Sequence, residues 1–109
     1  MVKIEWTDEA VYWLREIHDY IALENKSVAK RISKEILNKV QILATFPQIG
    51  YVYNNEKDEE IRILLYGHYR IAYLVEEEII SILGVFHGAL EIESIVMLLD
   101  FHTKTPYSS

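Results

Sequence analysis

The chain lacks cysteine, and no apolar run is long enough to span a bilayer. Without cysteine it forms neither a disulfide framework nor a thiolate nucleophile. We expect no zinc site either, because neither His18 nor His68 has a partner at metal-ligand spacing. No basic-then-apolar leader opens the sequence, so we expect a cytoplasmic protein without a membrane segment. Glycine-rich phosphate loops and nucleophile motifs are also absent, and we predict no cofactor.

Basic side chains are scarce in the second part of the sequence. Residues 1–45 hold seven basic and seven acidic side chains, whereas residues 46–109 hold four basic and ten acidic ones. The second part therefore carries the whole formal charge of −6. Because phosphate binding needs clustered Lys and Arg, we expect only weak direct binding of nucleic acid. We interpret the acidic surface as a contribution to solubility.

The first half of the sequence predicts a strand and two helices. Val2–Trp6 alternates apolar and polar side chains, as a strand does. Thr7 is a good N-cap, and apolar residues then recur at helical spacing to about Glu24. We expect Ser27 to cap a second amphipathic helix, which Pro47 ends. The short connection makes the two helices an antiparallel hairpin.

The second half predicts strands. After a polar segment at residues 54–60, interpreted as an exposed loop, turns at residues 67–68 and 76–78 separate three apolar stretches: Ile61–Tyr66, Tyr69–Val75 and Ile79–Phe86. The last two are apolar on both faces, so we expect them to be central and covered on both sides. Residues 90–99 fit a terminal helix or a last strand, and we expect a flexible tail over about residues 100–109.

These elements predict an α+β fold in a single domain over residues 1–109. The N-terminal strand and helical hairpin would precede a three- to four-stranded antiparallel sheet that packs on the helices. Within that sheet, the hairpin from Arg62 to Val75 contains two arginines, Arg62 and Arg70, among mostly apolar residues. Burying a guanidinium is costly unless it is paired or used, so each arginine serves either architecture or chemistry.

Three segments resemble the RelE/ParE toxin superfamily of type II toxin–antitoxin modules. Ile17-His-Asp-Tyr-Ile-Ala22 is similar to the family's I-x-x-Y-I-A stretch, and Leu43–Gly50 is similar to its L-x-x-x-P-x-x-G signature. Tyr69-Arg-Ile-Ala-Tyr73 and the later segment Ile80–His87 resemble the Y-R-I-x-Y and I-L-x-V-x-H strands. The likeness spans about residues 3–92, and the shared order and spacing of the motifs make it fairly specific.

The resemblance implies a toxin that a cognate antitoxin neutralises by folding a disordered segment around it. The helix and strand proportions resemble the ParE branch, associated with inhibition of DNA gyrase, more than the RelE branch, which cuts messenger RNA on the ribosome. In the first interpretation the protein acts by binding and is not an enzyme. In the second it is a ribosome-dependent endoribonuclease. In the third it is a degenerate, non-toxic member that binds an antitoxin for regulation.

Arg70 is the leading candidate for a partner- or phosphate-binding residue. A fixed guanidinium can hold a phosphate bidentately, and the resemblance implies this role because the matching arginine of RelE-like nucleases contacts the scissile phosphate. The alternative is an ion pair with a glutamate. Arg62 stands where RelE-like enzymes begin a basic pair, but Leu64 occupies the second position. We expect Arg62 at a sheet edge or facing the antitoxin.

His87 and Tyr73 would carry proton transfer if the protein were a nuclease. A histidine at the end of a strand is more often a hydrogen-bonded terminus, and Gly88-Ala-Leu90 replaces the arginines that usually follow it in the family. Three strand tyrosines could stack on a base, although at strand spacing we expect core packing: Tyr66, Tyr69 and Tyr73. We interpret Glu76–Glu78 as a solvated turn, with contact to a divalent ion as the alternative.

Overall fold

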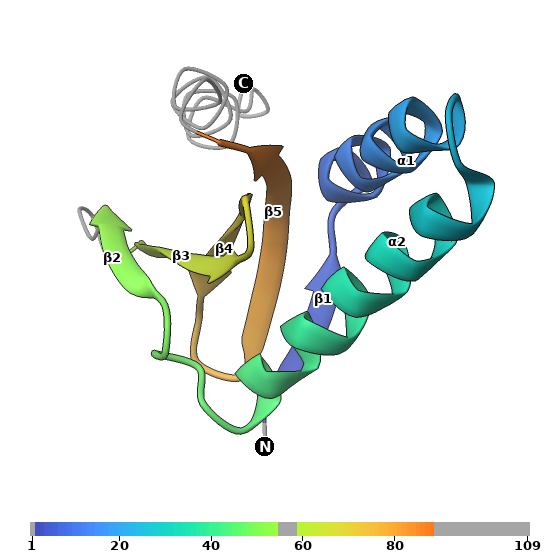
Figure 1. The fold of residues 1–109 in the computed structure, drawn as a ribbon. Coiled ribbons are helices and arrows are strands. Elements are labelled where there is room, and N and C mark those ends of the chain that lie inside the picture. The colour runs from blue at the N-terminus through green and yellow to red at the C-terminus, as the bar shows by residue number, and fades with distance from the viewer. Residues whose placement is uncertain (1, 55–58, 89–109) are drawn as a thin grey trace.

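The computed structural model describes residues 2–54 and 59–88, and the predictions for residues 89–109 lie outside them. The chain runs from a strand through two helices and a short 3-10 helix into four further strands (Figure 1). The elements are β1 Lys3–Trp6, α1 Asp8–Ala22, α2 Lys26–Val40, η1 Gln41–Ala44, β2 Tyr51–Asn54, β3 Glu60–Tyr66, β4 Tyr69–Val75 and β5 Ile79–His87. The α+β prediction is confirmed.

The five strands form one mixed sheet in the order β1-β5-β4-β3-β2. Strands β2 to β5 pair antiparallel, whereas β1 pairs with β5 in parallel, with Lys3 opposite Ile79 and Trp6 opposite Ile82. The four strands that follow the helices form the predicted antiparallel sheet, whereas the parallel addition of β1, which makes the sheet five-stranded and mixed, was not predicted. A parallel pair has no connecting turn to reveal it, because the chain between the two strands holds all the other elements. The short β2 lies beside the segment interpreted as a loop.

Side-chain caps fix the start of both helices. The Thr7 hydroxyl oxygen accepts a hydrogen bond from the Ala10 N–H at 3.1 Å and donates one to the Ile82 carbonyl at 2.7 Å. The predicted cap is confirmed, and it also joins the start of α1 to β5. The Ser27 cap is wrong, because Asn25 accepts from the Val28 N–H at 3.0 Å and α2 begins at Lys26. Asparagine and serine cap about equally well, so residue preference alone does not choose between them.

The helical hairpin covers one face of the sheet (Figure 1). Helix and strand side chains meet there in one buried cluster. Its strand members alternate with side chains of the other face, as the pleat requires. We call this side the helix face; its buried residues are Ala10, Ile36, Val40, Leu43, Leu64, Ile71, Tyr73, Ile80, Ile82 and Val85.

The opposite face of the sheet is also apolar and buried. Its cluster consists of Ile61, Ile63, Ala72, Leu74, Leu83 and Phe86. Trp13 of α1 reaches it at the sheet edge, where its ring centroid lies 5.7 Å from that of Phe86. Strands β4 and β5 are thus interior strands buried on both faces, as their apolar sequences predict.

The turn between β3 and β4 falls at Gly67-His68, as predicted. Gly67 has φ +58°, a left-handed conformation that a two-residue hairpin turn requires and that glycine adopts without steric cost. The Gly88 N–H donates to the His68 carbonyl at 2.9 Å. This bond holds the turn beside the end of β5.

Candidate functional site

The strand register separates the three residues proposed for a nuclease site. Arg70 pairs with Phe86, a member of the cluster on the face away from the helices. Tyr73 belongs to the helix-face cluster, and His87 pairs with Tyr69, which packs against that cluster. Arg70 therefore lies on one side of the sheet, and Tyr73 and His87 lie on the other.

Arg70 is half-buried, and its guanidinium remains available to a partner. The Arg70 Nη1 donates a hydrogen bond of 3.3 Å to the hydroxyl of Tyr51 on β2. Within the described ranges, Arg70 makes no ion pair with a carboxylate. The alternative of an ion pair that ties the sheet to a loop is therefore not found in this part of the chain.

The guanidinium of Arg62 binds the segment that follows η1. Its Nε donates to the carboxylate of Glu60, and its Nη1 donates to the backbone carbonyls of Gln48 at 3.0 Å and Gly50 at 2.5 Å. Its side chain is only 16% exposed. Both protons on Nη1 and the proton on Nε are used within the chain. These bonds hold the Pro47–Gly50 turn against the sheet.

Tyr73 completes the attachment of this turn. The side chain has no exposed surface, and its hydroxyl oxygen accepts a hydrogen bond from the Gly50 N–H at 2.9 Å. Burial raises the pKa of Tyr73, which the Gly50 bond and the nearby Arg62 partly counteract. A buried hydroxyl with this partner is a core residue, in agreement with the packing interpretation.

Replacing Tyr73 with phenylalanine should cost about 1–3 kcal/mol, since the buried Gly50 N–H then lacks its acceptor. The raised pKa also predicts a dependence on pH. The unfolded hydroxyl ionises near 10.0, whereas the folded one stays neutral to higher pH, so this stabilisation is complete below pH 10 and is lost as the pH rises above it. Urea unfolding below and above pH 10 should show a shallower alkaline loss for Tyr73→Phe than for wild type. Tyr20→Phe, at a side chain 77% exposed, is the matched control.

The other two strand tyrosines lie on the helix side. The Tyr66 hydroxyl donates to the Glu35 carboxylate of α2, and this bond is the main cause of a raised pKa for Tyr66. Tyr69 is half-buried, and burial raises its pKa. Tyr66 is thus bonded to α2, and both tyrosines pack against the helix-face cluster, as the packing interpretation predicts.

His87 lies in a groove between α1 and the ends of β4 and β5. Its ring centroid is 5.2 Å from that of Tyr69 and 6.0 Å from that of His68. The groove has a volume of about 380 Å³ and is mostly apolar; its walls include Trp13, Ile17, Tyr20, Tyr69, Val85 and His87. Tyr20 is 77% exposed at its rim. We call this the α1 groove.

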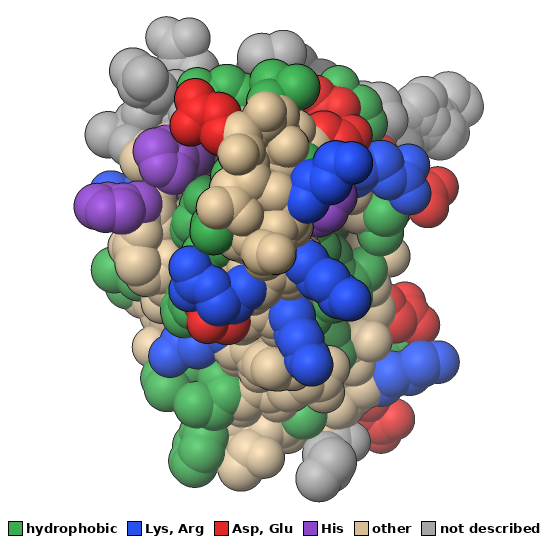
Figure 2. Space-filling view, turned by 45° about the vertical axis from the view of Figure 1, so that its right-hand side comes forward, with side chains coloured by type: hydrophobic (Ala, Val, Ile, Leu, Met, Phe, Trp, Pro, Cys, Tyr) green, Lys and Arg blue, Asp and Glu red, His purple; other side chains and the backbone are tan. Residues whose placement is uncertain are grey.

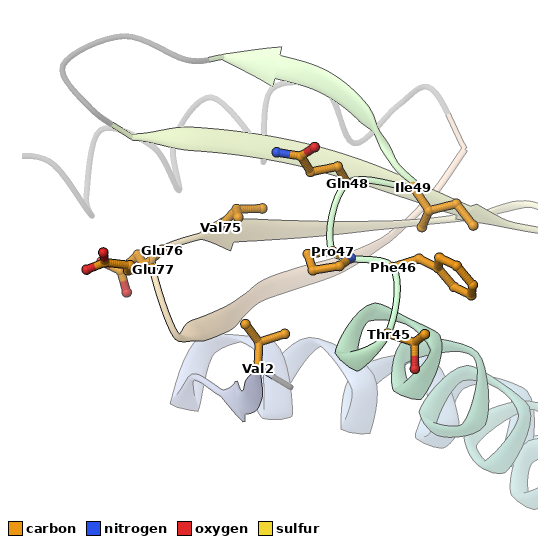
Figure 3. A pocket seen from close by; sticks show the side chains of 9 residues that line it. All are labelled: Val2, Thr45, Phe46, Pro47, Gln48, Ile49, Val75, Glu76 and Glu77. Atoms are coloured by element: carbon orange, nitrogen blue, oxygen red, sulfur yellow. The ribbon is translucent and has the colours of Figure 1, made fainter.

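A second hollow, of about 580 Å³, lies at the opposite end of the sheet. Figure 3 shows that its walls come from Val2, the Thr45–Ile49 segment and the turn after β4. Phe46 and Ile49 are about half exposed there. The turn itself is closed by the Glu76 N–H, which donates to the Ile79 carbonyl at 2.9 Å.

The Glu76–Glu78 segment is a turn between β4 and β5, as predicted. Among residues 2–54 and 59–88, no cluster of His, Asp or Glu side chains could hold a metal ion. The same residues contain no helix long and apolar enough to cross a membrane.

Comparison with known proteins assigns the chain to a family. A family model described as "ParE toxin of type II toxin-antitoxin system, parDE" matches residues 4–91. The chain belongs to the ParE toxin family. The resemblance found in the three sequence segments is thereby confirmed, including the preference for the ParE branch.

A solved structure described as "Chromosomal ParDE TA system from P. aeruginosa" shares this ParE fold. The TM-score is 0.65 at 21% sequence identity, and the match covers 81% of this chain and 97% of that chain. No curated protein matches the chain. At this identity the likeness establishes the fold.

Two features of this ParE chain escaped the sequence analysis. The first is the bonding of Arg62 and Tyr73 to the Pro47–Gly50 turn, which joins residues 12 to 23 positions apart. The second is the α1 groove, whose signal was a surplus of apolar side chains on the first helix. Tyr20, which lines the groove, is 77% exposed.

Proposed function

We propose that this ParE-family protein is a toxin that acts by binding DNA gyrase and does not cut RNA. The placement of Arg70 on one face of the sheet, with Tyr73 and His87 on the other, is the observation that supports binding over cleavage. A general acid or base must come within hydrogen-bond reach of the group it serves, so a phosphate held by Arg70 is beyond the reach of either residue. Gyrase is proposed because the ParE branch is associated with its inhibition.

Purified full-length protein should inhibit the supercoiling of relaxed plasmid by gyrase in the presence of ATP. Arg70→Ala should unfold at the same temperature as wild type, so a weaker inhibition by this variant would report a binding contact between the guanidinium and gyrase. Unchanged supercoiling at a large molar excess of folded wild-type protein would refute the proposed target. Normal growth of cells that overproduce the protein without an antitoxin would instead favour the non-toxic, regulatory interpretation.

A cognate antitoxin is the second partner of the proposed function. The similar solved structure is that of a ParDE system, and a toxin that is neutralised by a protein needs a surface for it. The α1 groove fits an apolar segment of such a partner, since Trp13, Ile17 and Tyr20 present aromatic and aliphatic surface beside Tyr69 and Val85. Aromatic side chains in apolar grooves supply most of the binding energy in many interfaces.

Co-production with the product of a neighbouring reading frame should restore growth if that frame encodes the antitoxin. Tyr20→Glu places a charge in the groove at an exposed position, so it should weaken neutralisation while toxicity remains. Glu24→Gln, an exposed site outside the groove, should stay neutralised. Neutralisation of Tyr20→Glu at wild-type antitoxin levels would show that the antitoxin binds elsewhere.

A further inference from the structure

The second helix carries a charge opposite to that of the rest of the protein. α2 contains one acidic residue, Glu35, and five basic ones: Lys26, Lys30, Arg31, Lys34 and Lys39. Its formal charge is therefore +4, and because the whole chain has −6, the remaining residues carry −10. Such a separation of charge orients the molecule toward an anionic partner and turns its other surfaces away.

The cations of α2 gather with other hydrogen-bond donors on the outer side of the helix. Ser27, Lys30, Arg31, Lys34 and Asn38 recur at helical spacing and line an open hollow of about 370 Å³ together with Glu35. Figure 2 shows basic side chains gathered in the middle of one face, with most acidic groups toward its rim. We call the five donor residues the α2 face. With a rise of about 1.5 Å per residue, it extends over roughly 16 Å.

Two of these cations, Lys30 and Lys34, form no ion pair within the described part of the protein. Arg31 pairs with Glu35 at 3.6 Å, and Glu35 in turn accepts from Tyr66, so this arginine helps to join α2 to β3. Lys30 and Lys34 are both exposed, and no carboxylate among residues 2–54 and 59–88 lies within ion-pair distance of either. No contact among the described residues gives these two charges a role in stabilising the fold.

We propose that the α2 face binds the phosphate backbone of duplex DNA. Lysine, arginine, serine and asparagine side chains are the groups that contact phosphates in protein–DNA complexes. The hollow has no aromatic wall, so it offers nothing on which the unpaired bases of a single strand could stack. A row of about 16 Å can reach phosphates on both rims of a major groove about 12 Å wide. This inference goes beyond the proposed function and does not require gyrase.

Fluorescence anisotropy with a short labelled DNA duplex, full-length protein and no other protein tests this proposal. Wild type should bind weakly at low salt, and the logarithm of the binding constant should fall with the logarithm of salt concentration with a slope of about −2 to −3, as expected for two to three phosphates. Lys30→Gln with Lys34→Gln should lose most of the binding and reduce the slope by about 2. Circular dichroism should show an unchanged fold.

The matched control is Lys3→Gln with Lys39→Gln, which also removes two positive charges, but from positions outside the α2 face. It should retain binding and slope. Equal losses in both double variants would overturn the proposal, because the overall charge of the protein would then explain the binding. A wild-type protein that does not bind duplex DNA at low salt would also overturn it. If polyglutamate competed as strongly as unlabelled duplex, the α2 face would be a site for an acidic peptide and the proposal would be wrong. Tighter binding to single-stranded RNA than to duplex DNA would also contradict the proposal.

Discussion

Gly50→Ala should destabilise the protein by about 3–5 kcal/mol, because it combines overpacking with the loss of a buried hydrogen bond. An added Cβ would lie 2.5 Å from the Ile63 carbonyl oxygen and 2.8 Å from the Tyr73 hydroxyl oxygen. Backbone and a fully buried ring cannot easily move away. The turn would have to leave the sheet, breaking the bonds from Gly50 to Tyr73 and from Arg62 to Gly50. Urea unfolding followed by circular dichroism measures the change.

Gly67→Ala is the control for this substitution. Gly67 has a positive φ of 58°, but nothing lies within 4 Å of an added Cβ. Its cost should be limited to the left-handed backbone, about 1–2 kcal/mol. An equal or smaller loss for Gly50→Ala than for Gly67→Ala would mean that the close approach of the turn to the sheet is not important for stability.

Arg62→Met should cost about 2–4 kcal/mol, less than the full penalty of an unpaired buried charge because Glu60 keeps some contact with water. Methionine fills similar space but leaves the Gln48 and Gly50 carbonyls and the Glu60 carboxylate without their donor. For a domain of this size the melting temperature should fall by roughly 10–30 °C. Differential scanning calorimetry gives the value directly.

The same substitution at Arg70 is the matched control, because it removes an arginine from the neighbouring strand. Arg70 makes one exposed hydrogen bond of 3.3 Å to Tyr51, so Arg70→Met should change stability by no more than about 0.5 kcal/mol. A loss at Arg70 as large as at Arg62 would contradict the division of the two arginines into one that holds the fold and one that is free to contact a partner.

The local features of the fold could be predicted from the sequence, and the long-range ones could not. Hydrophobic periodicity and cap chemistry place α1 after Thr7, and apolar stretches around Gly67 place the β3–β4 hairpin. The parallel pairing of β1 with β5 joins residues about 76 positions apart, such as Lys3 and Ile79, with no turn between them to indicate it. Only the packed structure shows that β1 completes this side of the sheet.

The candidate site shows the same limit. Arg70 and Tyr73 are three residues apart on one strand, so alternation alone predicts opposite faces for them, but the sequence could not say on which face His87 of the next strand would lie. Face depends on register, and one residue of shift reverses it. The register shift after Ala72, opposite β5, is such a feature, and nothing in the apolar run of β5 marks it. The family motifs therefore identified the fold and strand alternation separates Arg70 from Tyr73, whereas the side on which His87 lies required the structure.

The measurement that tests the central claim most directly is a toeprinting assay on ribosomes translating a defined messenger RNA, with and without the purified full-length protein. Because Arg70 lies on the other side of the sheet from Tyr73 and His87, we predict identical patterns and no cleavage. New cuts that appear with wild-type protein and disappear with Arg70→Ala would contradict the account, since they would show that these residues form a working nuclease site.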